Sequence, residues 1–201
     1  MGWLARTPVV GITISSVLAW PCATLGLPAR QVPDRSHGRI RRVKILIRRA
    51  VSTDAGALAR LRSVMFEAME VPVGDRDSAW LGEARQWFTH HLATCDVAAF
   101  VAETSDGELV AAALGQVTRH APSPANPLGV SGHLSNVVTD PGYRRRGLAR
   151  ACVEQLLTWF RDATTAHDVD LYATDHGAAL YESLGFGGRA HPAMSRSIRR
   201  G

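Results

Sequence analysis

Three consecutive arginines, Arg144, Arg145 and Arg146, precede Gly147 at the expected start of a helix. The first turn of a helix exposes backbone N–H groups without a partner in the helix, and these groups form its positive end. Guanidinium groups add charge and paired donors, and a glycine lets a phosphate approach the backbone. The segment therefore predicts an anion site suited to a pyrophosphate. A solvated basic turn is the alternative interpretation.

A strand and a helix must position these arginines. Strand-like sequence runs from His133 to Thr139, and turn-forming residues at 140–142 follow it. The sequences G-x-G-x-x-G and G-x-x-x-x-G-K-[ST] do not occur, which argues against Rossmann and Walker-type nucleotide sites. The expected helix continues to about Asp162 with one apolar stripe, Leu148, Cys152, Leu156 and Phe160.

The remaining pattern from Val43 onward predicts one domain with the element order βααβββαβαβ. Two helical stripes follow Asp54, and two apolar runs joined by a turn at 105–107 predict an antiparallel hairpin. A loop rich in proline and glycine covers 120–132. The fold class is therefore α+β, with a mixed, mostly antiparallel central sheet flanked by helices. The expected strands are 44–49, 97–102, 109–117, 133–139, 169–173 and a last one ending near Ile198; a short helix covers 175–184.

Residues 1–42 lack a sustained period and form a poorly ordered extension or leader in this interpretation, whereas 43–201 form the domain. The apolar run from Val9 to Leu27 follows Arg6, as in a secretory signal. An interfacial helix is disfavoured by the prolines. An upstream extension from a misplaced start codon, a membrane anchor and a disordered arm all stay open.

Charge and composition exclude several classes of function. The chain has 201 residues, 46% of them apolar, and a net charge of +5. Nine basic residues and one acid lie before Ala50, so the remaining 152 residues carry 14 basic and 17 acidic groups. We therefore expect no nucleic-acid partner. No apolar run reaches the length of a membrane span, and the three cysteines lack the spacing of a metal site.

The sequence around the arginines resembles the GCN5-related N-acetyltransferase (GNAT) family. The family motif [Q/R]-x-x-G-x-[G/A] is met by Arg144, Gly147 and Ala149 within TDPGYRRRGLA. About 35 residues later, YESLGF from Tyr181 to Phe186 matches a second family segment at the family's spacing. The resemblance covers roughly residues 43–201, and the predicted element order is also that of the family.

The resemblance implies direct transfer of an acetyl group from acetyl-CoA, as cosubstrate, to a primary amine. The fourth strand of the family, here near 137–139, would hold the pantetheine arm and stabilise the oxyanion, and Tyr181 would give a proton to the leaving thiolate. Thr174 stands where the family often has asparagine, and its hydroxyl could replace part of that contact. The implied cofactor-binding residues are Val137, Val138, Thr139, Arg144, Arg145, Arg146, Gly147, Leu148, Ala149 and Thr174.

No single base for the acceptor amine can be selected from the sequence. His133, Ser135 and Asn136 lie on the expected fourth strand of the family. The resemblance implies that the acceptor would be a small-molecule or peptide amine. It also implies a cytoplasmic location, and a homodimer is a further expectation. A non-catalytic acyl-CoA-binding or sensing module is the alternative function. Other candidates for the base are Glu70, Asp75, Glu83, His90, His91, Glu103 and His176.

Overall fold

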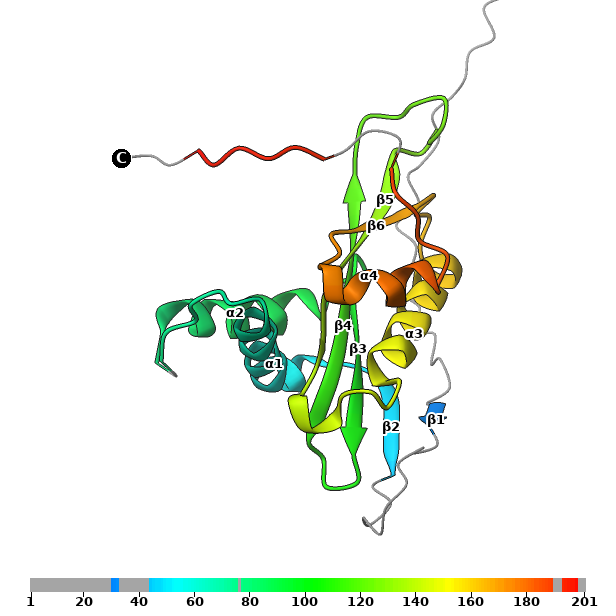
Figure 1. Ribbon diagram of the computed structural model, residues 1–201. Helices are drawn as coiled ribbons and strands as arrows, with labels where there is room; N and C mark the ends of the chain where they lie inside the picture. The colour runs from blue at the N-terminus through cyan, green and yellow to red at the C-terminus, as the bar shows by residue number, and fades with distance from the viewer. Residues whose placement is uncertain (1–29, 33–43, 76, 190–192, 199–201) are drawn as a thin grey trace, which may run out of the picture.

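The computed structural model describes residues 30–32, 44–75, 77–189 and 193–198, and a six-stranded sheet lies at its centre (Figure 1). The strands follow one another in chain order across the sheet. Adjacent strands are antiparallel except β5 and β6, which are parallel. This arrangement confirms the predicted mixed, mostly antiparallel sheet. The strands are β1 (Arg30–Val32), β2 (Ile45–Arg49), β3 (Val97–Thr104), β4 (Leu109–Arg119), β5 (Val130–Thr139) and β6 (Val169–Leu171).

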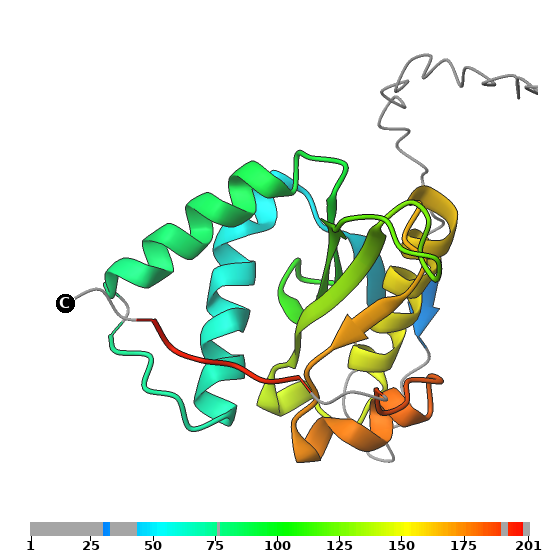
Figure 2. The same cartoon turned by 90° about the horizontal axis from the view of Figure 1, so that it is seen from above.

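Helices cover both faces of this sheet (Figure 2). One face packs on α1 (Ala55–Ala68) and α2 (Ala79–His91), and the other packs on α3 (Leu148–Ala163). The short helix α4 (Asp175–Glu182) joins the α3 side through Tyr181. Two single turns of 3₁₀ helix, η1 (Ser52–Asp54) and η2 (Pro141–Tyr143), precede α1 and α3. None of the helices in the described part of the chain is long and apolar enough to cross a membrane.

Because both faces of the sheet are covered, β3 is apolar from Val97 to Ala102. Ala98 and Phe100 face α3, whereas Val97, Ala99 and Val101 face α1 and α2. Alternate residues of a strand point to opposite faces, so a run of consecutive apolar residues supplies both cores. This feature explains why the hairpin predicted from the apolar runs is confirmed.

The helix α3 lies close to the sheet because two glycines face it. A Cβ atom at Gly132 would lie 2.5 Å from Cε1 of Phe160, and one at Gly115 would lie 2.8 Å from Cδ1 of Leu156. These distances are far below van der Waals contact, so the two glycines provide the space into which Phe160 packs. Cys152 is fully buried in the same core, as its place in the apolar stripe predicts.

The structure differs from the sequence prediction mainly at the end of the chain. The predicted last strand ending near Ile198 is wrong for the residues that the structure describes after α4, which form no strand. Gly187 and Gly188 have no side chain to pack and are costly to order in a strand. Residues 193–198 are all exposed, so they lack the buried face that would stabilise a strand. Strand β5 also begins three residues earlier than predicted.

Three residues of the predicted N-terminal extension take part in the sheet. Arg30–Val32 form β1, which pairs antiparallel with β2, with Arg30 opposite Ile47 and Val32 opposite Ile45. The rest of the extension, residues 1–29 and 33–42, lies outside the described residues. The division of the chain at residue 43 therefore stays a prediction.

Candidate functional site

The two parallel strands at one side of the sheet separate after a short contact. Pairing joins 132–134 of β5 to 169–171 of β6, and β5 then continues to Thr139 paired only with β4 on its other side. Asn136 and Val137 of β5 together oppose the single residue Ala113 of β4, and Asn136 has a φ of 49°. This is the geometry of a β-bulge, which bends a strand and re-aims its side chains. The bulge and the separation open the sheet beyond Leu134.

A cleft of about 1310 Å³ occupies this opening. Its walls come from the last seven residues of β5, the second half of α1 and residues 172–181 at the start and body of α4. Elements that are far apart in the sequence therefore meet around one cavity. Seven of the predicted site residues line it: Val137, Val138, Thr139, Arg144, Ala149, Thr174 and Tyr181.

The residues of β5 bring both apolar and polar groups to the cleft. Val138 is 7% exposed and packs on the α1 side, whereas Val137 packs on the α3 side, because the bulge reverses the alternation of the strand. The hydroxyl of Thr139 is buried and makes no hydrogen bond to any described residue. A buried hydroxyl without a partner is costly, so this atom suits a ligand that would complete its hydrogen bonding.

At one end of the cleft, residues 144–147 form a loop, called the arginine loop below, that leads into α3. Arg145 and Gly147 have φ values of 62° and 77°, so the loop turns sharply twice before the helix begins. Arg144 donates from Nε to the carbonyl of Thr139 at 3.2 Å, and the guanidinium of Arg146 lies over the ring of Tyr143. Arg144 and Arg145 are exposed, and the N-terminal N–H groups of the 16-residue helix follow them. The loop therefore combines cations with free amide donors.

Arg145, Arg146, Gly147 and Leu148 lie beside the cleft rather than on its lining. The side chain of Leu148 is 2% exposed and belongs to the core under α3. Its predicted contact with a ligand could therefore come only from its backbone N–H. Gly147 is exposed, with open space where a side chain would begin.

Tyr181 lies on the opposite wall of the cleft, on α4. Its ring packs edge-on against Phe186 at a centroid distance of 6.0 Å. Gly177, one turn earlier, gives this ring room, since a Cβ there would lie 3.0 Å from Cε2 of Tyr181. Burial raises the pKa of the Tyr181 hydroxyl above its ordinary value. The hydroxyl is therefore a proton donor that stays protonated at neutral pH. Thr174 precedes the helix and is exposed.

The sequence model of the Acetyltransferase (GNAT) family matches residues 60–186. The chain belongs to this family. The match covers α1 through α4 and includes the arginine loop and Tyr181. No curated protein matches the sequence.

Solved structures share the GNAT fold of this chain. A predicted acetyltransferase from Clostridium acetobutylicum, solved with acetyl-CoA, has a TM-score of 0.67 at 20% identity, covering 76% of this chain and 96% of that one. A GCN5-related N-acetyltransferase from Ralstonia eutropha has a TM-score of 0.61 at 26% identity, covering 77% and 98%. Glucosamine-6-phosphate N-acetyltransferase from Arabidopsis thaliana has a TM-score of 0.60 at 18% identity, covering 77% and 99%.

This GNAT domain has a second cavity, of about 870 Å³, between the sheet and α2. Aromatic side chains of α2 form much of its wall, among them Trp80 and Trp87, and Glu83 is its one carboxylate. Trp80 donates from Nε1 to the carbonyl of Val73 at 2.7 Å, which fixes the ring over the loop between α1 and α2. The cavity thus combines aromatic rings with polar side chains, among them one carboxylate and the guanidinium of Arg62.

Four residues line both cavities of the GNAT domain: Arg62, His133, Ser135 and Asn136. Arg62 of α1 donates to the side-chain oxygen of Asn136 and lies 4.7 Å from the ring centroid of Phe66. Burial lowers the pKa of Arg62, although a guanidinium stays charged at neutral pH. The four residues mark the place where the two cavities meet.

The structure separates the candidates for the base. Glu70 and His176 line only the first cleft, and Glu83 and His90 line only the second cavity. Asp75, His91 and Glu103 line neither. Glu103 instead accepts from Arg48 at 2.6 Å. No cluster of metal-ligating side chains occurs in the part of the chain that the structure describes.

Two site residues were missed by sequence reasoning. Asp170 contacts His133 across the β5–β6 pair, and the two residues are 37 positions apart. Only the register of the parallel pair brings them together, so no sequence pattern could show it. Arg62 directly follows Leu61, which belongs to the apolar stripe of α1. The position of this charge beside a buried residue was the signal that could have indicated Arg62 as a site residue.

Proposed function

We propose that this protein is an acetyl-CoA-dependent N-acetyltransferase that transfers the acetyl group directly to a primary amine. The observation that carries the proposal is the opening between β5 and β6, which lies between the arginine loop on one side and Tyr181 on the other. Family membership supports acyl transfer, and the Clostridium relative was solved with acetyl-CoA.

The cleft fits the parts of an acyl-CoA. Arginine side chains and the first N–H groups of α3 would hold the pyrophosphate. The free edge of β5 beyond Leu134 offers backbone groups to the pantetheine arm, and the unpartnered Thr139 hydroxyl suits a polar atom of the same ligand. Backbone N–H groups near 137–139 would stabilise the oxyanion formed in acyl transfer. In this proposal the predicted cofactor residues on β5 and those of the arginine loop beside the cleft would hold one ligand together.

The acceptor enters through the second cavity in this proposal. That cavity meets the cleft at His133, Ser135 and Asn136, so an amine bound there could face the thioester. In this proposal the rings of Trp80 and Trp87 would contact the body of the acceptor, and the carboxylate of Glu83 would attract its cationic amine. After the C–N bond forms and the C–S bond breaks, Tyr181 would protonate the leaving thiolate.

A thiol-release assay with acetyl-CoA across a panel of amines tests the proposal, together with thermal shifts on adding acetyl-CoA. We expect acetyl-CoA to raise the melting temperature and at least one arylalkyl or alkyl amine to release CoA. Absence of both effects would overturn the proposal. A thermal shift without turnover on any amine would favour the non-catalytic acyl-CoA-binding module instead.

Other expectations from the sequence stay predictions. A cytoplasmic location, a homodimer and the leader role of residues 1–42 each await their own measurement. The absence of a nucleic-acid partner also stays a prediction, and it is consistent with the acidic excess after residue 49.

A further inference from the structure

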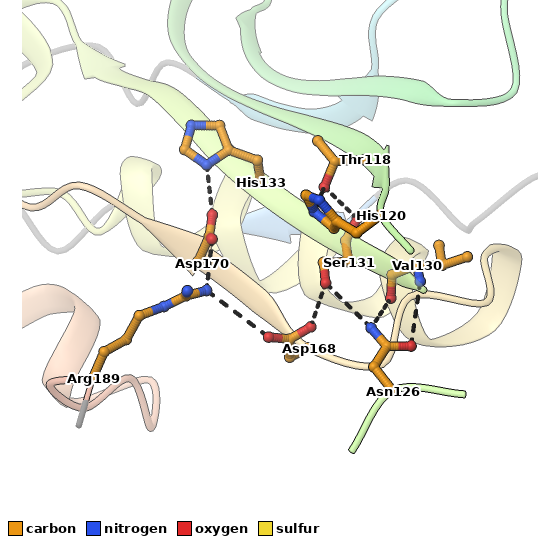
Figure 3. A network of polar contacts seen from close by, with 9 residues as sticks. All are labelled: Thr118, His120, Asn126, Val130, Ser131, His133, Asp168, Asp170 and Arg189. Carbon is orange, nitrogen blue, oxygen red and sulfur yellow. Dashed lines mark hydrogen bonds and ion pairs between the residues drawn. The ribbon is translucent and has the colours of Figure 1, made fainter. Parts of the chain in front are cut away.

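His133 lies where the first cleft and the second cavity meet, and its imidazole contacts the carboxylate of Asp170. The parallel register places the two residues opposite each other, and Nδ1 of His133 lies 2.6 Å from Oδ1 of Asp170 (Figure 3). The pair is half-buried, with side-chain exposures of 27% and 37%. Its position follows from the strands themselves rather than from a loop.

The surrounding contacts fix the carboxylate of Asp170. Arg189 donates to the other oxygen of Asp170 at 2.6 Å and also lies 3.9 Å from Asp168. Asp168 accepts from the hydroxyl of Ser131 at 2.7 Å. Figure 3 shows this chain of contacts along the edge of β5 and β6. Asp170 is therefore held on both oxygens, and the imidazole of His133 is oriented by a fixed partner.

This contact also sets the tautomer of His133. A carboxylate only accepts hydrogen bonds, so Nδ1 must carry the proton that joins the two groups. Nε2 is then the nitrogen with a free lone pair, and it points away from Asp170 (Figure 3). A histidine held in this way can accept a proton at Nε2, and the developing imidazolium is stabilised by Asp170.

His133 is the one suitable base among the four residues that line both cavities. Arg62 is permanently cationic, and the side chains of Ser135 and Asn136 are not bases at neutral pH. The other titratable or charged groups around the junction come from every neighbouring element. They are Asp170 of β6, Tyr172 directly after β6, Glu83 and His90 of α2, Glu67 of α1, and Asp175 and His176 of α4; Gln116 of β4 pairs opposite His133.

We propose that His133, oriented by Asp170, removes the proton from the acceptor ammonium in the acyl transfer. The inference rests on the proposed function and assigns its missing base. Nε2 takes one proton from R–NH₃⁺, and the free amine forms a C–N bond to the thioester carbon. The C–S bond breaks and its electron pair goes to sulfur. The sulfur takes a proton from Tyr181, and Tyr181 regains a proton from the nitrogen of the newly acetylated amine. The imidazolium of His133 releases its proton to solvent. Asp170 is a positioning residue.

The test compares His133→Gln with the wild-type chain on two acceptors of similar shape. One is an alkyl amine that is cationic at the assay pH, and the other is a weakly basic amine that is already neutral. Base catalysis by a side chain contributes at least about 100-fold, so we expect a loss of that order in kcat for the cationic acceptor. With the neutral acceptor the loss in kcat should be less than tenfold. The rise in melting temperature on adding CoA should be the same in His133→Gln as in the wild type.

Asp170→Asn and a matched control complete the experiment. Removing the carboxylate should lower kcat for the cationic acceptor and leave the rate with the neutral acceptor nearly unchanged, because Asp170 acts only through the histidine that takes the proton. A purely structural role for Asp170 would lower the rates with the two acceptors equally. The control is His120→Gln, because His120 is exposed at the end of β4 and contacts Thr118, and it should retain wild-type rates.

The outcomes separate the two proposals. If the wild-type chain acetylates amines but His133→Gln keeps its rate and pH profile, the base assignment is wrong and the acetyltransferase function stands. An equal loss on both acceptors would also overturn the assignment, because it would show that His133 does not act on the proton. If the wild-type chain acetylates no amine, the proposed function fails and the base assignment fails with it.

Discussion

At the scale of single residues, the proposed proton donor and the proposed proton acceptor lie on different elements. Tyr181 belongs to α4, and burial raises the pKa of its hydroxyl, so the phenol keeps its proton. His133 belongs to β5 and faces the other cavity as well. The sequence could indicate Tyr181 because it stands in a family segment. It could not select His133, because the partner that orients it lies in another strand.

Replacing Tyr181 with phenylalanine removes the hydroxyl and keeps the packed ring. We expect kcat to fall by about 100-fold while the thermal shift produced by CoA is unchanged, because a general acid acts on the leaving thiolate and not on binding. Since the pKa of Tyr181 is raised, the acid form persists above pH 10 and any basic limb of the wild-type kcat profile should lie above that pH. Steady-state kinetics from pH 6 to 11 measure this. Unchanged turnover in Tyr181→Phe would assign the tyrosine to packing alone.

At the scale of elements, Arg48 of β2 joins three parts of the chain. It donates to Glu103 of β3 at 2.6 Å and to both oxygens of Asp54, in η1, at 2.7 and 3.0 Å. Burial by itself would raise the pKa of Asp54, but hydrogen bonds from Arg48 and the N–H of Val51 outweigh it and the pKa is lowered. The cluster therefore fixes the start of α1 against the sheet.

Asp54→Asn tests this connection through its pH dependence. The ordinary pKa of an aspartate is 3.8, and the pKa of Asp54 in the folded chain is lower. The Asp54 carboxylate therefore stabilises the folded chain at pH values above 3.8, and this stabilisation is lost as the pH falls below that value. We expect the variant to lose about 1–2 kcal/mol at pH 7 and to show a weaker fall in stability between pH 5 and 3. Urea unfolding at several pH values measures both. Asp162→Asn, at a solvent-exposed pair with Arg161, should change the curves much less, because an exposed ion pair contributes little to stability; equal effects in the two variants would contradict the prediction.

The packing of α3 on the sheet gives a second prediction for an element. In Gly132→Ala the new methyl group would meet the ring of Phe160 at 2.5 Å, and overpacking of this kind costs about 1–3 kcal/mol. Gly82→Ala is the control, since nothing lies within 4 Å of its Cβ and alanine favours a helix. Thermal unfolding should rank Gly132→Ala well below the wild type and Gly82→Ala at or above it. Adding Phe160→Leu to Gly132→Ala should recover part of the lost stability. If it recovers none, the destabilisation does not come from the clash with the ring of Phe160.

The spacing of apolar residues predicts helices and strands that bury an apolar face of their own. It fails for features that depend on how one strand pairs with another. The stripes of α1, α2 and α3 and the β3–β4 hairpin were predicted because their apolar spacing repeats over several turns or residues. Strand β1 has only three residues, and it exists through its pairing with β2. The predicted last strand lacks a buried face. The bulge at Asn136 depends on the register of β4 and β5, which no local pattern encodes.

At the scale of the whole molecule, two cavities that meet at β5 could each hold one substrate of the proposed reaction. The cleft between β5 and α4 opens beside the arginine loop, and the second cavity opens beneath α2. The two share only the four residues at their junction. Cys152 is fully buried, and burial raises the pKa of its thiol to about 12, so this cysteine is not available as a nucleophile. The arrangement favours direct transfer between two bound substrates.

Initial-rate kinetics test this arrangement. If acetyl-CoA and the amine occupy separate cavities together, double-reciprocal plots at several fixed amine concentrations should intersect, because both substrates bind before either product leaves. Trp87→Ala should then raise the KM of the amine severalfold while the KM of acetyl-CoA changes by less than twofold, since Trp87 lines only the second cavity. Parallel lines, or acetyl group retained on the protein after gel filtration without amine, would instead indicate a covalent intermediate. An equal rise in both KM values for Trp87→Ala would show that the two cavities do not divide the substrates.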